Sequence, residues 1–191
     1  MYSSNANIDA ARKRLIEIIK YRSFQNGNKI KLSSGRSSQF YFDMKPTMLN
    51  PEGSYLIGLL ILDLIKSDNA ELIGGLEMGA VPLATAISVV SYLQNSPIPA
   101  FFVRKQAKEY GMQLELEGFS TGETIERKSV VIVEDVTTTG KSALRAINSV
   151  SNAGGKVAAV ASIVDREEGA HETFLKAGVP FKHVLSLKDF N

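Results

Sequence analysis

The order of hydrophobic and polar residues predicts alternating strands and helices over most of the chain. From about residue 71 onward, short continuous apolar runs alternate with amphipathic segments of helical period. Such runs are typical of parallel strands buried on both faces, and the alternation predicts an α/β fold with a parallel sheet flanked by helices. The expected strands are Glu71–Gly75, Ala100–Arg104, Ser129–Glu134, Lys156–Asp165 and Phe181–Leu187, and the expected helices are Ala80–Leu93, Gly140–Ala153 and Glu168–Ala177.

Two further helices are expected before this alternating part. Asp9 is a suitable cap for a helix that continues to about Arg22, with apolar residues along one face. The sequence Asn50-Pro51-Glu52 combines a capping residue, a proline at the first helical position and an acid in the first turn. We therefore expect a second helix from Pro51 to about Lys66.

Two short strands are expected between these helices, where the alternation is interrupted. Lys29–Leu32 and Gln39–Asp43 have strand-like composition, and a polar loop at 33–38 separates them. We expect a single domain spanning residues 1–191. In it, residues 1–45 contribute to a small hood subdomain over one end of the sheet, and residues 46–191 form the α/β core.

Composition and charge narrow the classes of function. Hydrophobic and charged residues make up 44% and 22% of the chain, which is the balance of an ordinary globular protein. The net charge is +2 with both signs scattered, so we expect neither a nucleic-acid partner nor a membrane partner. The chain has no cysteine, which excludes disulfides and thiolate metal sites. Its first residues lack the apolar core of a signal peptide, and we expect a cytoplasmic protein.

The segment from Val130 to Val150 carries the most specific chemistry. An apolar strand delivers two adjacent acids, after which a hydroxyl-rich turn leads into a helix. Hydroxyls, a glycine and free backbone amides at a helix N-terminus suit a phosphate monoester, and paired carboxylates suit the hydroxyls of a ribose. The segment predicts a site for a phosphorylated sugar, assigned to Glu134, Asp135, Val136, Thr137, Thr138, Thr139, Gly140, Lys141 and Ser142.

This segment has two alternative interpretations. Gly140 could merely permit a tight turn while the threonines cap the helix, but adjacent charges after an apolar strand are costly without a ligand or cation. Gly140-Lys141-Ser142 also resembles the end of a nucleotide-binding P-loop. That motif requires a glycine five positions earlier, where this chain has Asp135. A carboxylate would face the phosphate oxygens there, which excludes the P-loop.

Residues 130–143, VVIVEDVTTTGKSA, resemble the 5-phosphoribosyl-1-diphosphate signature of the type I phosphoribosyltransferases. The resemblance implies the fold of that family: a parallel sheet flanked by helices, with a small N-terminal hood. The signature is specific for the family but does not identify the base that receives the sugar.

A basic segment, Arg104–Gly111, resembles the catalytic loop R-K-x-x-K-x-H-G of orotate phosphoribosyltransferases. The resemblance implies that Arg104, Lys105 and Lys108 neutralise the departing diphosphate, with Asp135 as a further catalytic residue. Tyr110 stands where the family usually has histidine, and it can donate a hydrogen bond while remaining neutral. A solvated charged loop is the alternative interpretation.

Residues 33–43, SSGRSSQFYFD, resemble the N-terminal S-G-R-x-S-x-x-Y-F element of the same family. The resemblance implies that Tyr41 or Phe42 lies against the orotate ring, although an aromatic run is also typical of a core. Many family members have a lysine where this chain has Ser33. Lys45 is a candidate to supply the missing cation.

Two later segments complete the resemblance. Gly74–Ala84 is similar to the family's diphosphate loop, which implies that the backbone of Glu77, Met78 and Gly79 faces the diphosphate, although the loop's usual lysine is absent. Asp165–Gly169 matches a D-R-x-E-G element. It implies that Arg166, together with Thr138, recognises orotate, while a surface charge cluster is the alternative interpretation.

Together these segments, from residue 33 to about 169, resemble the orotate phosphoribosyltransferases. The resemblance implies transfer of a phosphoribosyl group from 5-phosphoribosyl-1-diphosphate to orotate in pyrimidine biosynthesis. It also implies a Mg²⁺ cofactor that is not held mainly by the protein, and a homodimer in which the Arg104–Gly111 loop acts in trans. The alternatives are a purine-base phosphoribosyltransferase and a non-catalytic ligand-sensing regulator, which would be expected to carry a DNA-binding helix or a basic face.

Overall fold

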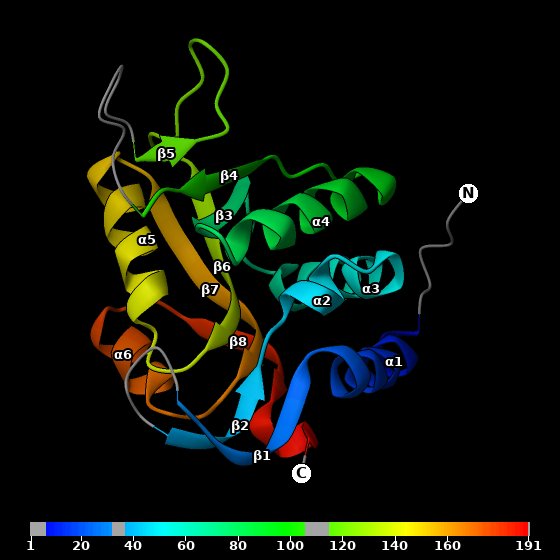
Figure 1. The fold of residues 1–191 in the computed structure, drawn as a ribbon. Coiled ribbons are helices and arrows are strands. Elements are labelled where there is room, and N and C mark those ends of the chain that lie inside the picture. Colours follow the sequence, from blue (N-terminus) through cyan, green and yellow to red (C-terminus); the bar gives the residue numbers. More distant parts are fainter. Residues whose placement is uncertain (1–6, 32–36, 106–114, 191) are drawn as a thin grey trace.

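A mixed β-sheet lies at the centre of the molecule (Figure 1). The computed structural model describes residues 7–31, 37–105 and 115–190, and within these ranges six strands form the sheet in the order β5-β4-β3-β6-β7-β8. The neighbours from β4 to β8 are parallel, and β5 is antiparallel to β4. The strands are β3 (Leu72–Leu76), β4 (Ala100–Val103), β5 (Leu116–Glu117), β6 (Ser129–Thr137), β7 (Lys156–Asp165) and β8 (Phe181–Ser186).

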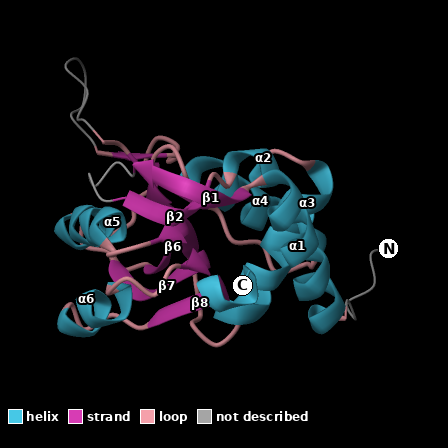
Figure 2. Ribbon diagram, turned by 60° about the horizontal axis from the view of Figure 1, so that its bottom comes forward, coloured by secondary structure: helices cyan, strands magenta, loops and turns pink. Residues whose placement is uncertain are grey.

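Helices cover both faces of this sheet, as Figures 1 and 2 show. Val131 and Val133 of β6 belong to one buried cluster with the helices of one face, and Val130 and Ile132 belong to a second cluster on the other face. The predicted parallel sheet flanked by helices is confirmed. The first face carries α1 (Ile8–Arg22), α3 (Pro51–Ile65) and α4 (Ala80–Leu93), and the second carries α5 (Lys141–Asn152) and α6 (Ala170–Lys176).

The two strands near the N-terminus form a separate antiparallel hairpin of β1 (Phe24–Lys31) and β2 (Ser37–Phe42). We call this hairpin the hood. The rings of Phe24 and Phe42 contact each other and the ring of Phe190, with centroid distances of 4.9–5.3 Å. Phe190 ends the short helix η1 (Leu187–Phe190), so residues from the far end of the chain hold the hood. Helix α1 packs mainly against α3 and also contacts β1 and η1.

Several element boundaries differ from the sequence prediction. Asn7, not Asp9, caps α1, because its side chain accepts a hydrogen bond from Ala10 N at 3.0 Å. The predicted cap Asn50 is confirmed, since its side chain accepts from Gly53 N at 3.0 Å. Strand β6 continues three residues beyond Glu134, so the two acids lie within the strand and not after it.

A short helix, α2 (Lys45–Met48), connects the hood to α3 and was not predicted. Met44 and Met48 are buried, and the hydroxyls of Thr47 and Ser23 form a buried hydrogen bond of 2.7 Å. These contacts fix the backbone from which Lys45 projects.

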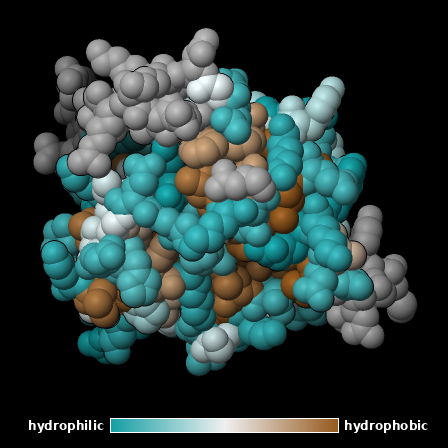
Figure 3. Space-filling model, turned by 90° about the horizontal axis from the view of Figure 1, so that it is seen from below, coloured by the Kyte–Doolittle hydropathy of each residue, from teal (hydrophilic) through white to brown (hydrophobic). Residues whose placement is uncertain are grey.

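The face seen from below is mostly hydrophilic, with apolar side chains showing in patches (Figure 3).

Candidate active site

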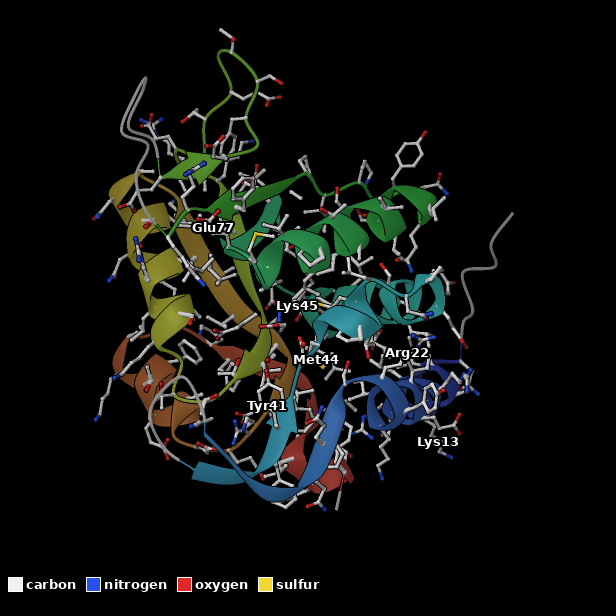
Figure 4. The ribbon with its side chains drawn as sticks, in the orientation of Figure 1. Lys13, Arg22, Tyr41, Met44, Lys45 and Glu77 are labelled. Atoms are coloured by element: carbon white, nitrogen blue, oxygen red, sulfur yellow. The ribbon has the colours of Figure 1, made fainter. Side chains whose placement is uncertain are left out.

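A cleft of about 360 Å³ lies where the loops after β3 and β4 meet the end of β6. Loops and helix starts converge beyond the carboxyl ends of parallel strands, which is where α/β sheets bind ligands. In Figure 4, Lys45 lies between Tyr41 of the hood and Glu77 of the loop after β3. The cleft is lined by Lys45, Leu76, Glu77, Met78, Gly79, Ala80, Lys105, Val133, Glu134, Asp135, Ser142 and Ala143.

The structure brings several predicted site residues together in this cleft, from four separate segments of the chain. Lys108 and Tyr110 lie outside the described residues, as does the S-G-R part of the hood element at 33–36. The predicted residues that line the cleft are Glu77, Met78, Gly79, Lys105, Glu134, Asp135 and Ser142.

Glu134 is a partly buried carboxyl group. Burial raises its pKa to about 7, and the neighbouring charge of Asp135 acts in the same direction. Hydrogen bonds from the hydroxyls of Thr137 and Ser142 oppose this shift, and the distance from Thr137 Oγ1 to Glu134 Oε2 is 3.2 Å. A ligand that donates hydroxyl groups to Glu134 would favour its ionised form.

Asp135 is the second acid of the pair. Burial raises its pKa, while a 2.9 Å hydrogen bond from Val136 N and the charge of Lys45 lower it. A Cβ atom added to Gly79 would lie 2.7–3.0 Å from the Asp135 carboxyl group. A larger residue at position 79 would therefore push this carboxyl group aside, whereas glycine lets the loop after β3 approach it closely.

The turn between β6 and α5 has a left-handed residue at its end. Gly140 adopts φ +79°, and α5 begins at the next residue. Its backbone also lies against Phe174, because an added Cβ atom would be 2.7 Å from Phe174 Cζ. The first amides of α5 are therefore available beside the end of β6, as an anion site requires.

The side chain of Thr137 does not face this turn. The residue is fully buried, and its hydroxyl binds Glu134. The hydroxyl of Thr137 is thus engaged inside the protein, because β6 extends through this residue, and the assignment of Thr137 to the phosphate site stays a prediction. Val136, Thr138 and Thr139 are partly exposed, and Lys141 is exposed.

The loop from Glu77 to Gly79 is tied to the start of the basic segment. Glu77 Oε1 accepts a hydrogen bond from Lys105 N at 2.8 Å, and Glu77 N donates to Val103 O at 2.8 Å. The peptide bond between Glu77 and Met78 is cis. On the other side, the guanidinium group of Arg145 on α5 donates to Lys105 O. Glu77 and Arg145 thus hold both polar groups of the Lys105 backbone, and no local sequence pattern signals these long-range contacts.

Arg104 is not among the residues that line the cleft. Its guanidinium group forms an ion pair of 3.2 Å with Glu117 of β5, and its backbone N donates to Glu115 O at 2.8 Å. Arg104 therefore lies at the base of the basic segment, beside the edge strand.

The two aromatic candidates of the hood lie on opposite faces of β2. Phe42 is 8% exposed and packs against Phe24 and Phe190, so its ring belongs to the core and is not presented to a ligand. Successive side chains of a strand point to opposite faces, which leaves the partly exposed Tyr41 as the candidate for stacking on a base. The prediction for Phe42 is corrected accordingly.

Arg166 is buried at the carboxyl end of β7. It is 5% exposed, and its Nη2 atom forms an ion pair of 2.6 Å with Glu168. Its backbone N donates to Thr137 O at 2.9 Å, which places it beside the end of β6. The alternative interpretation as a surface charge cluster is therefore wrong.

The described residues contain no group of three or more His, Cys, Asp or Glu side chains arranged to hold a metal ion. Over the same part of the chain, no helix is long and apolar enough to cross a membrane.

The chain matches known phosphoribosyltransferases over nearly its whole length. The family model described as "Phosphoribosyl transferase domain" matches residues 51–177. The chain belongs to the phosphoribosyltransferase family. An orotate phosphoribosyltransferase of Rhodopseudomonas palustris is 55% identical over 181 residues, covering 95% of this chain and 96% of that protein. One from Aquifex aeolicus is 41% identical, covering 93% and 96%.

This chain also shares its fold with solved structures of the family. The crystal structure of Mycobacterium tuberculosis orotate phosphoribosyltransferase in complex with 5-phospho-alpha-D-ribosyl 1-diphosphate superposes with a TM-score of 0.78. The two sequences are 36% identical, and the match covers 94% of this chain and 98% of that one. The predicted type I phosphoribosyltransferase fold is confirmed.

Proposed function

We propose that this protein is a cytoplasmic enzyme that transfers a phosphoribosyl group from 5-phosphoribosyl-1-diphosphate to orotate, giving orotidine 5′-monophosphate and diphosphate in pyrimidine biosynthesis. The observation that carries the proposal is the cleft, in which the acid pair Glu134 and Asp135, the start of α5 and the Glu77–Gly79 loop converge. The 55% identity to an orotate phosphoribosyltransferase supports orotate as the acceptor.

Each part of the cleft suits a different part of the donor. The carboxylates of Glu134 and Asp135 accept hydrogen bonds from the two ribose hydroxyls, and the turn from Thr138 to Ser142 binds the 5′-phosphate with backbone amides and hydroxyls. The diphosphate lies against the Glu77–Gly79 loop. The orotate ring lies near Tyr41 of the hood, with its polar edge toward Thr138 and Arg166.

The chemistry requires positioning more than covalent participation by the protein. As the bond from ribose C1 to the diphosphate breaks, positive charge develops on the ribose ring, and orotate N1 forms the new bond. Arg104, Lys105 and Lys108 stabilise the diphosphate as it leaves. The paired carboxylates hold the ribose in a reactive orientation.

The cleft also fits a Mg²⁺ ion that is held mainly by substrate. Its carboxylates offer oxygen ligands, but the described residues form no complete protein cage. Mg²⁺ commonly keeps water and substrate phosphates as ligands alongside one or two carboxylates. When bound, the ion would neutralise charge on the diphosphate.

The choice of base is tested by supplying the donor and Mg²⁺ with orotate, adenine, xanthine or uracil in turn. We expect diphosphate release with orotate at a rate at least about 100-fold above that with the other bases, because Arg166 pairs with the carboxylate that they lack. Loss of orotate absorbance provides an independent readout. Faster release with adenine or xanthine would assign the protein to purine metabolism instead.

We further propose that the active form is a homodimer in which the Arg104–Gly111 loop acts in trans. An apolar groove of about 470 Å³ between α3 and α4 supports an interface between copies, because large exposed apolar surfaces commonly mark such contacts. Leu49, Tyr55 and Val89 are exposed there. Lys105 lines the cleft of its own chain, so the trans contribution is assigned to the part of the loop that includes Lys108.

Subunit complementation tests this arrangement. A Lys108→Ala protein and an Asp135→Asn protein are each expected to be nearly inactive. If Lys108 acts in trans, random mixed dimers contain one intact site, and about a quarter of the wild-type activity returns. If the mixture stays inactive although an affinity tag on one variant co-purifies the other and so shows exchanged dimers, the loop acts within its own chain.

A further inference from the structure

The described lining of the cleft contains more carboxyl groups than ammonium groups before any substrate binds. It contains the carboxyl groups of Glu77, Glu134 and Asp135, against the ammonium groups of Lys45 and Lys105. The donor would add a 5′-phosphate and a diphosphate, both negatively charged, to this site. The Glu77–Gly79 loop has no cation of its own, so a charge for the diphosphate must come from another element.

Lys45 reaches the cleft from the opposite side to this loop. It is the first residue of α2, and its neighbours Met44, Thr47 and Met48 are buried. Its backbone is therefore fixed, while its side chain is 62% exposed. Lys45 and the Glu77–Gly79 loop line the same cleft, and Figure 4 shows Lys45 on the side of Glu77 that faces the hood.

The present partner of Lys45 can be exchanged for a ligand. Lys45 Nζ binds Asp43 Oδ1 at 2.8 Å, and both side chains of this pair are substantially exposed, at 62% and 37%. Exposed ion pairs contribute little to stability, so a phosphate oxygen can replace this carboxylate at small cost. The hydrogen bond from Lys45 to Asp43 raises the pKa of Lys45, and the negative charge of Asp135 adds to the effect, so the ammonium group stays charged at neutral pH.

We propose that Lys45 is a diphosphate-binding residue, which supplies from the hood side the cation that the Glu77–Gly79 loop lacks. On donor binding, its ammonium group leaves Asp43 and donates to a diphosphate oxygen. This inference rests on the proposed use of a diphosphate donor, but it does not depend on which base accepts the sugar.

The test compares Lys45→Met with Lys45→Arg, because methionine keeps much of the aliphatic stem and arginine keeps the charge. Loss of one charge-assisted hydrogen bond is expected to raise both the KM for the donor and the Kd for magnesium diphosphate by about 10- to 100-fold. The KM for orotate should stay within about threefold. Lys45→Arg should restore both constants to within about fivefold of the wild type.

Lys66→Met is the matched control. Lys66 forms a similar exposed ion pair with a nearby acid, Asp63, at 2.9 Å, but it does not line the cleft. Its replacement should leave both constants unchanged, and thermal unfolding should show that all variants are folded. Calorimetric titration with magnesium diphosphate requires no base, so it remains informative even if orotate is not the acceptor. The proposal is overturned if Lys45→Met binds diphosphate as the wild type does, or if it raises the KM for orotate alone.

Discussion

Replacing Asp135 with asparagine is expected to lower kcat/KM by at least about 100-fold while stabilising the ligand-free protein. Asparagine keeps an oxygen that can accept the 2.9 Å hydrogen bond from Val136 N, so the shape of the site is preserved. It removes the charged acceptor proposed for a ribose hydroxyl. Activity therefore falls because an interaction with substrate is lost, and not because β6 is disrupted.

The stabilisation follows from the raised pKa of Asp135. The folded state binds the proton more tightly than the unfolded state, so the free energy of unfolding decreases as the pH rises above the ordinary carboxyl pKa. The substitution removes this penalty, so we expect the gain in stability to be present at pH 8 and small near pH 4. Urea unfolding at both pH values measures it.

Asp63→Asn serves as the control for this experiment. Asp63 lies on α3 in an exposed ion pair with Lys66, away from the cleft. Its replacement should change neither the activity nor the free energy of unfolding by a measurable amount, because exposed ion pairs contribute little to stability. An Asp135→Asn protein that keeps more than about a tenth of the activity would contradict the assignment of Asp135 to the ribose.

Replacing Gly140 with alanine is expected to destabilise the fold by about 3 kcal/mol and to weaken donor binding by at least about 100-fold. Alanine is strained at φ +79°, and its Cβ atom would lie 2.7 Å from Phe174 Cζ. Phe174 is fully buried and cannot move aside without disturbing the core. The start of α5 must then shift, and with it the proposed phosphate site.

Gly178→Ala separates the effect of the left-handed backbone from the effect of the contact with Phe174. Gly178 also has a left-handed backbone, with φ +69°, but nothing lies within 4 Å of the position that an alanine Cβ atom would take. The Gly178→Ala protein should lose only about 1 kcal/mol of unfolding free energy, from backbone strain, and should keep wild-type donor affinity. Urea unfolding and calorimetric titration of the donor are the measurements. Equal losses in the two variants would show that the contact with Phe174 has no part in the effect.

The order of hydrophobic and polar residues was sufficient to predict the sheet and its covering helices. The helix Ala80–Leu93 and the strand Lys156–Asp165 were predicted with the observed bounds, because apolar periodicity and flanking glycines define both. The cap of α1 was placed two residues late, because both Asn7 and Asp9 are good capping residues. The end of β6 was placed early, because pairing with β7 carries the polar residues after Val133 into the sheet.

The candidate site was predictable where one rule applies, namely that carboxyl ends of parallel strands meet at one edge. That rule brings the acid pair, the Glu77–Gly79 loop and Lys105 together. It says nothing about long-range partners. The role of Phe42 depends on Phe190 from the far end of the chain, and the fixed backbone of Lys105 depends on Glu77 and Arg145.

The contact of Phe190 with the hood has a practical consequence for handling the protein. The aromatic contacts of Phe24, Phe42 and Phe190 join the last helical turn to the strand that carries Tyr41. Helix α1 contacts η1 as well, since Arg12 forms an ion pair of 2.8 Å with Asp189. A bulky affinity tag or surface-immobilisation linker attached close behind Phe190 would therefore press on the strand that carries Tyr41, so a flexible spacer is needed there.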